Sequence, residues 1–172
     1  MVMKTSNNSL SQSNITASNE YINVFLVGNN PIEMGPIYKY LSVLKKNRII
    51  AEFCFDIKDS FNRILKMQPS CILLDDTLSK HYIKKLIQNL RNHRRTRDIP
   101  ITLLKSNNHR EVVANGIQDF LLKENLSADR LWKTILNSIK FKRNQRILNY
   151  IYYKRKTQAG RYIQSIRDKV GI

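Results

Sequence analysis

The stretch CILLDD, from Cys71 to Asp76, consists of four apolar residues followed by two adjacent carboxylates. A short apolar run without alternation is typical of a strand buried on both faces, as in the middle of a parallel sheet. Carboxylates are costly to bury without a partner. We therefore expect Asp75 and Asp76 to lie at the end of a buried strand and to belong to a site there.

Segments with strand and helix patterns alternate on both sides of this stretch. Four further strands are predicted, at 21–27, 49–55, 101–104 and 119–123. Apolar spacing predicts helices at 36–47, 59–67, 80–92 and 109–116, and a long helix from Ser127 to 156. Strands that alternate with helices favour an α/β fold, a doubly wound five-stranded parallel sheet with a C-terminal helical extension. In such sheets the ligand site lies at the carboxyl ends of the strands.

Composition limits the class of protein. The 172 residues are enough for one domain with a core, and the formal net charge of +17 attracts polyanions. The chain has no apolar run of the roughly 20 residues that span a bilayer, and its start lacks the apolar segment of a secretory signal. We expect a cytoplasmic protein, not an integral membrane protein, with a flexible leader at 1–19. Cys54 and Cys71 lie in apolar runs and are expected to stay reduced in the core.

Four segments in order resemble the receiver domains of bacterial response regulators, the CheY-like family. They are FLVGNNP (25–31), PSCILLD (69–75), TRDIPITLL (96–104) and NGIQDFLLK (115–123). The resemblance covers about residues 21–140 and implies the strand order 2-1-3-4-5. It divides the chain into a leader at 1–19, a receiver-like domain at 20–140 and a basic helical extension at 141–172.

The resemblance assigns roles to three residues. Asp75 matches the aspartate that accepts a phosphoryl group, and Lys123 matches the lysine that contacts it. Phe120 matches the aromatic switch residue. In the family the reaction needs a divalent cation, because the phosphoryl group and the aspartate are both anionic.

The sequence departs from the family at the residues that would bind the cation. Gly28 and Asn29 occupy the positions of the acidic pair, so only Asp75 and the Asn29 oxygen, with Asp76 nearby, remain as ligands. We expect no cofactor, or at most weak Mg²⁺ binding at Asp75 and Asn29.

A second departure concerns the switch. Lys105 stands at the position of the family's Ser or Thr, and Ser106, a second candidate for the switch, would point to the opposite face of the strand. Our hypothesis is that Lys105 and Lys123 neutralise Asp75 permanently, in place of a metal ion. Gly35 and Pro36 would also shorten the start of the first helix and open the loop before it.

The region from 140 to 172 contains ten basic residues and one acidic residue, a net charge of +9, with tyrosine and isoleucine between them. Candidates for polyanion binding are Lys142, Arg143, Arg146, Lys154, Arg155 and Lys156. Such a helix can lie on nucleic acid, on an anionic membrane surface or in a partner's groove. It can equally be a solvated helix that packs back on the domain or pairs with a second copy. A second basic cluster, Arg91, Arg94, Arg95 and Arg97, is expected at the end of the sheet opposite Asp75.

These features predict a stand-alone regulator, not an enzyme, that acts by contact with a protein partner, a kinase or a downstream regulator. Metal-dependent phosphorylation would be weak or absent. Two alternatives stay open: a competent response regulator phosphorylated at Asp75, and a regulator that binds nucleic acid through its basic tail. A homodimer is also compatible with the sequence.

Overall fold

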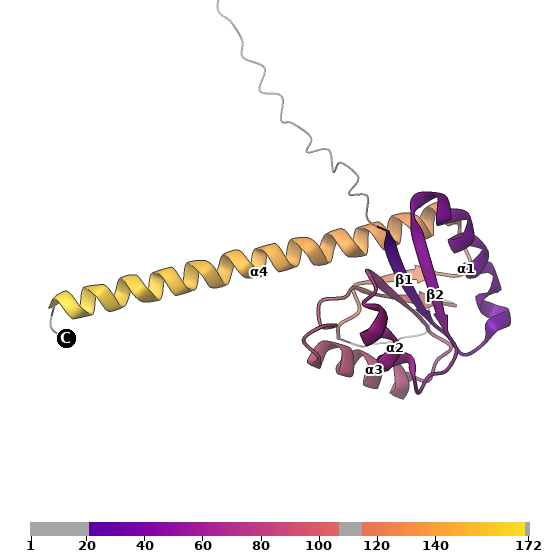
Figure 1. Ribbon diagram of the computed structural model, residues 1–172, viewed down its shortest axis with the longest axis horizontal. Coiled ribbons are helices and arrows are strands. Elements are labelled where there is room, and N and C mark those ends of the chain that lie inside the picture. The colour runs from indigo at the N-terminus through magenta and orange to yellow at the C-terminus, as the bar shows by residue number, and fades with distance from the viewer. Residues whose placement is uncertain (1–20, 107–114, 171–172) are drawn as a thin grey trace, which may run out of the picture.

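The computed structural model describes residues 21–106 and 115–170, which form a five-stranded parallel sheet with helices on both faces (Figure 1). The strands are β1 (Ile22–Val27), β2 (Ile49–Cys54), β3 (Cys71–Asp75), β4 (Ile101–Lys105) and β5 (Asp119–Leu122). They pair in parallel in the order β2-β1-β3-β4-β5. The predicted fold class and strand order are therefore confirmed.

The helices are α1 (Pro31–Val43), the 3₁₀ helix η1 (Leu44–Asn47), α2 (Ser60–Met67), α3 (Lys80–Asn92) and α4 (Ala128–Val170). Apolar residues of α2 and α3 join one buried cluster, and those of α1 and the first part of α4 join the other. The two faces of the sheet are covered by these two pairs. The predicted leader at 1–19 lies outside the described residues. So does the predicted helix at 109–116, except for residues 115 and 116.

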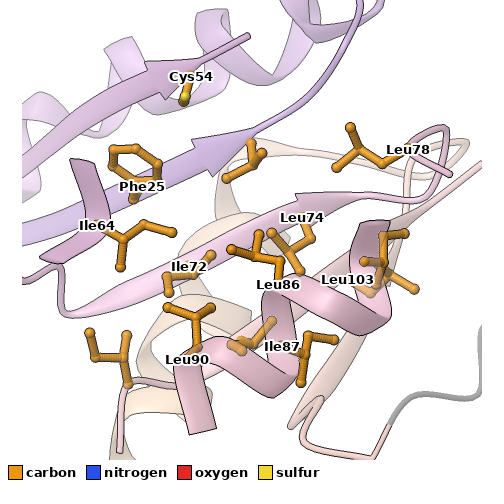
Figure 2. Close-up of a cluster of buried hydrophobic side chains, with 14 residues drawn as sticks. Phe25, Cys54, Ile64, Ile72, Leu74, Leu78, Leu86, Ile87, Leu90 and Leu103 are labelled. Carbon is orange, nitrogen blue, oxygen red and sulfur yellow. The ribbon is translucent and has the colours of Figure 1, made fainter. Parts of the chain in front are cut away.

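The core on the α2–α3 face forms around β1 and β3 (Figure 2). Phe25, Ile72 and Leu74 are fully buried, and Ile64 and Leu86 cover them from the two helices. Every residue of β3 is buried, including Asp75. The unbroken apolar run of this strand thus has its expected cause, a helix layer on each side.

Helix α1 begins at Pro31, so the prediction that it begins at Gly35–Pro36 is wrong. The Asn30 side chain accepts a hydrogen bond from the Ile32 amide at 3.0 Å, and Pro31 follows it, an arrangement favoured at helix starts. Pro36 lies inside the helix, where it lacks an amide donor, yet the helix continues to Val43. The predicted open loop is also wrong, because only Gly28, Asn29 and Asn30 separate β1 from the helix. This early start places Met34 next to the end of β1.

Helix α4 begins as predicted and continues further. The Ser127 hydroxyl accepts a hydrogen bond from the Arg130 amide at 3.2 Å. Leu131, Ile135 and Ser138 are buried on the sheet, and the Ser138 hydroxyl lies 3.0 Å from that of Thr102. From 141 to 169 the side chains are exposed apart from a half-buried Lys142, and the helix projects away from the sheet. It therefore does not pack back on the domain (Figure 1).

The two cysteines are buried and do not form a disulfide. Burial raises the pKa of the Cys71 thiol to about 12, so this thiol stays protonated and behaves as a small apolar side chain. Among the described residues, no helix is long and apolar enough to span a bilayer.

Candidate functional site

The predicted site residues gather at the carboxyl ends of the strands. Val27 is paired with Leu74, so Gly28, which follows β1, lies beside Asp75 at the end of β3. Ser106 follows β4 and Lys123 follows β5, with the Lys123 amide bonded to the Lys105 carbonyl at 2.8 Å. The parallel register alone thus brings these residues to one edge of the sheet.

Asp75 is buried and ion-paired. Its side chain has no solvent exposure, and its Oδ1 accepts hydrogen bonds from the Lys123 ammonium and, at 3.2 Å, from the Thr77 amide. The Lys123 side chain is itself only 16% exposed. A charge-assisted bond in such a poorly solvated place is stronger than the same bond in water.

Lys123 also connects Asp75 to Asp76. Its Nζ lies 3.7 Å from Asp76 Oδ1 and 3.4 Å from the Ser106 hydroxyl. Ser106 in turn donates to Asp76 twice, from its amide at 2.9 Å and from its hydroxyl at 2.8 Å. The four residues Asp75, Asp76, Ser106 and Lys123 are called the acidic cluster below.

Lys105 does not join the acidic cluster, and its predicted contact with Asp75 is wrong. Successive residues of a strand point to opposite faces. Lys105 points to the same face as Leu103, which packs on the α2–α3 side. Leu73 and Leu121 pack on the α1–α4 side. Asp75 and Lys123, two residues after them, point to that side as well. Lys105 and Ser106 point to opposite faces of the sheet, as expected. Ser106, and not Lys105, is the residue that points toward Asp75 and Asp76.

Lys105 instead contacts Phe120. These residues share a face because Leu103 is paired with Phe120, and the Lys105 ammonium lies 5.6 Å from the centre of the Phe120 ring. Phe120 is 51% exposed on the edge strand β5. Its predicted role as a switch stays a prediction, and in this structure the ring faces outward.

Met34 closes the site from the side of β1. A Cβ atom added to Gly28 would lie 3.1 Å from both Cγ and Sδ of Met34 and 3.7 Å from Asp75 Oδ2. Met34 is buried, and Asp75 Oδ2 accepts no hydrogen bond within the described part of the chain. Met34 and Asp75 Oδ2 therefore both lie close to Gly28, which leaves little room for a side chain at that position.

Asn29 connects the end of β1 to the loop after β3. Its Oδ1 accepts a hydrogen bond from the Thr77 hydroxyl at 2.9 Å, and its Nδ2 donates to the Thr77 carbonyl at 3.4 Å. Sequence reasoning identified neither Thr77 nor Met34. The pair Asn30–Pro31 could have placed the start of the helix, and with it Met34 in the first turn.

No family model matches this chain, and no curated protein matches it. Solved structures do. The receiver domain of a sensor histidine kinase from Pseudomonas aeruginosa matches with 19% identity and a TM-score of 0.58 over 70% of this chain and 99% of its own. The receiver domain of a putative Luxo repressor protein from Vibrio parahaemolyticus matches with 18% identity and a TM-score of 0.58, over 75% and 98%. The Vibrio cholerae chemotaxis protein CheY4 matches with 16% identity and a TM-score of 0.55, over 69% and 99%.

The chain has the fold of response-regulator receiver domains. Among these receiver domains, the one from P. aeruginosa has a magnesium ion coordinated in its active-site cleft. The residues at the same end of this receiver fold do not suit that ion, which prefers about six oxygen ligands in octahedral geometry.

The oxygen atoms near Asp75 that could bind Mg²⁺ already have other partners, with one exception. Asp75 Oδ1 faces an ammonium, both oxygens of Asp76 accept bonds from Ser106, and the Asn29 oxygen accepts one from Thr77. Asp75 Oδ2 remains, and it lies near Gly28, as the thioether of Met34 does. No group of three or more His, Cys, Asp or Glu side chains suited to a metal ion occurs among the described residues.

The basic candidates fall into two sets. Lys142, Arg143 and Arg146 lie where α4 leaves the sheet, and the loop after α3 brings Arg94 and Arg95 to the same place. Lys154, Arg155 and Lys156 lie further along the exposed part of α4. Arg91 serves the structure instead, because its guanidinium donates to the carbonyls of Arg97 and Ile99 at 2.8 Å. This basic end is opposite the acidic cluster, as predicted.

Proposed function

We propose that this protein is a two-component signalling regulator of the receiver type that acts through contacts with a protein partner and not through phosphoryl transfer. The observation that carries the proposal is that Gly28 and Asn29 stand where the family has its acidic pair, so that Asp75, buried and paired with Lys123, has no carboxylate beside it at the end of β1 to hold a cation. An aspartate must present a free carboxylate oxygen to an incoming phosphorus for in-line attack. Without a cation to neutralise them, the like charges of the carboxylate and the phosphoryl group oppose that approach.

The role of the acidic cluster in this proposal is to fix the loops. Lys123 holds Asp75 and Asp76 together, and Ser106 joins Asp76 to the end of β4. These bonds connect the loops after β3, β4 and β5, the loops that a phosphoryl group would otherwise reorganise. The domain then presents one surface, including Phe120 and the β5 edge, to a kinase or a downstream regulator.

One observation favours the alternative of a competent phosphoacceptor. Asp75 Oδ2 accepts no hydrogen bond in the described part of the chain, so this oxygen would be the nucleophile if Met34 moved aside. The same experiment separates the two functions.

The test is incubation of the full chain with acetyl phosphate and Mg²⁺, followed by intact-protein mass spectrometry in acid, with Asp75→Asn as the blank. A competent receiver domain treated in parallel verifies the phosphodonor. We expect no stoichiometric phosphoryl adduct on the wild-type chain. A stoichiometric adduct that Asp75→Asn abolishes would establish the phosphoacceptor function instead.

Contact with a partner is tested separately, by affinity capture from cells of the source organism. The proposal expects the wild-type chain to capture the same proteins before and after treatment with the phosphodonor, because its surface does not depend on a phosphoryl group. Capture that requires the phosphodonor would contradict it.

A further inference from the structure

A basic groove lies at the amino end of the sheet, between the loop after α3 and the point where α4 leaves the domain. Its volume is about 470 Å³, and its floor includes the segments that enter β3 and β4, at Ser70 and Pro100. Five cationic side chains line it: Arg94, Arg95, Lys142, Arg143 and Arg146. The loop and the helix are almost 50 residues apart in sequence, and the fold alone combines them.

The positive charge of this groove is not balanced internally. Asp98 is the one acidic residue that lines it, and the ion pair of Asp98 is with Arg97, at 3.8 Å. Within the described residues, none of the five cations forms an ion pair. Partial burial lowers the pKa of Lys142, the nearby charges of Arg91 and Arg146 lower it further, and the charge of Asp98 offsets part of this shift. The groove is therefore a place of positive potential.

The positive surface continues along α4. Residues three and four positions apart lie next to each other on a helix. The series Arg143, Arg146, Tyr150, Lys154 and Arg161 follows this spacing, with Thr157 between the last two, and all of these side chains are exposed. At 1.5 Å per residue, this basic face extends about 27 Å from the groove.

Five apolar residues of the extension follow a different line, with Arg155 and Lys156 next to it. Leu148, Tyr152, Ala159, Tyr162 and Ile166 are also three, four or seven positions apart, and they lie about 160° around the helix from the basic face. A bilayer would bind that apolar line and leave the groove, which is a recess between loop and helix, turned away from the lipid. A ligand that contacts the groove and the basic face together must be elongated and densely anionic.

We propose that the basic groove, together with the basic face of α4, binds the phosphodiester backbone of a nucleic-acid duplex. A duplex carries one negative charge per about 1.7 Å of its axis, and its length can follow the groove and the helix without bending. Arg94 and Arg95 contact the backbone from the loop while the α4 side chains contact it from the helix. Because these are phosphate contacts, the binding is independent of base sequence.

The test measures binding of the full chain to a fluorescein-labelled 20-base-pair DNA duplex by fluorescence anisotropy, at several salt concentrations. The informative variant is Arg94→Gln with Arg95→Gln, because these residues lie outside the tail. The matched control is Lys84→Gln with Lys85→Gln, which removes two exposed charges from α3 away from the groove. Circular dichroism verifies that both variants are folded.

We expect the loop variant to weaken duplex binding by at least about tenfold and to reduce the salt slope by about two, while the control changes affinity by less than about threefold. If both variants lost the same affinity for the duplex, binding would depend only on the net charge of the protein and not on the groove. That result would overturn the proposal. Failure to bind the duplex at about 50 mM salt would also overturn it. So would binding to vesicles containing phosphatidylserine, or to polyglutamate, more tightly than to the duplex.

Discussion

The two ends of the sheet differ in whether their charged side chains are paired within the protein. At the carboxyl end, Asp75 and Asp76 are buried and share the ammonium of Lys123, whose side chain is 16% exposed. At the amino end, five cations line an open groove that contains one carboxylate. The first arrangement satisfies its charges within the protein, and the second leaves them for an external partner.

This difference indicates which end is committed to structure and which to binding. A buried ion pair gains little over an apolar pair of the same shape, but losing one of its partners is costly. Exposed cations without partners contribute little to stability and attract anions. The same substitution type, lysine to a neutral residue, should therefore have opposite effects at the two ends.

The largest effect is expected from Lys123→Met. This variant leaves the Asp75 carboxylate buried without its cation, which should lower the free energy of unfolding by about 3–5 kcal/mol in urea denaturation. The matched control is Lys133→Met, which breaks an exposed ion pair with Asp129 and should cost no more than about 0.5 kcal/mol.

The double variant Asp75→Asn with Lys123→Met sharpens the result. It removes both charges, so it should be more stable than Lys123→Met alone. If the single variant were as stable as the wild type, the carboxyl end would not depend on the ion pair and the comparison would fail.

A smaller effect is expected from Gly28→Asp, which restores an acidic residue of the family pattern. The new side chain would meet Met34, because a Cβ at this position lies 3.1 Å from Met34 Cγ, and it would add a third carboxylate next to Asp75. We expect a loss of about 1–3 kcal/mol in the free energy of unfolding. In a cycle with Met34→Ala, the two losses should be less than additive, since the alanine makes room. Strict additivity would show that Met34 does not close the site.

The smallest effect, with the opposite sign, is expected from Lys142→Gln in the groove. The pKa of Lys142 is lowered in the folded protein, so its positive charge opposes folding at neutral pH. The variant should equal or exceed the wild type in stability, by no more than about 0.5 kcal/mol. The difference should shrink as the pH rises from below the lowered pKa toward the ordinary value of 10.5, where the wild-type lysine becomes neutral in both states. A clear loss of stability would mean that the hydrogen bond from Lys142 Nζ to Gln145 Oε1, at 3.0 Å, outweighs the cost of burying the charge.

Patterns local in sequence predicted most of the fold. The apolar run at Cys71–Leu74 and the alternation of elements gave the sheet, because each strand and helix has its own period and end signals. The start of α1 was missed because the Gly35–Pro36 pair and the Asn30–Pro31 pair both resemble helix starts, and the Asn30 cap prevails.

The site was harder to predict, because it depends on contacts between strands. Asp75 and Lys123 meet as expected, but the face of Lys105 depends on which residues of β4 point to which side of the sheet, and the short segment Ile101–Lys105 does not reveal this. The basic groove could not be predicted from the sequence for a similar reason. The loop at Arg94 and Arg95 and the helix at Lys142 become neighbours only when α4 crosses the sheet.

The central claim is that Asp75 is balanced by Lys123 and not by a metal ion. The most direct measurement is a Mg²⁺ titration of the ¹⁵N-labelled chain, followed by NMR at the amides of Gly28, Asp76 and Ser106, with Asp75→Asn as the control. The account predicts no saturable shift at these amides up to about 10 mM Mg²⁺, a range in which a site of several carboxylates would fill. Saturable shifts that the Asp75→Asn variant abolishes would contradict it.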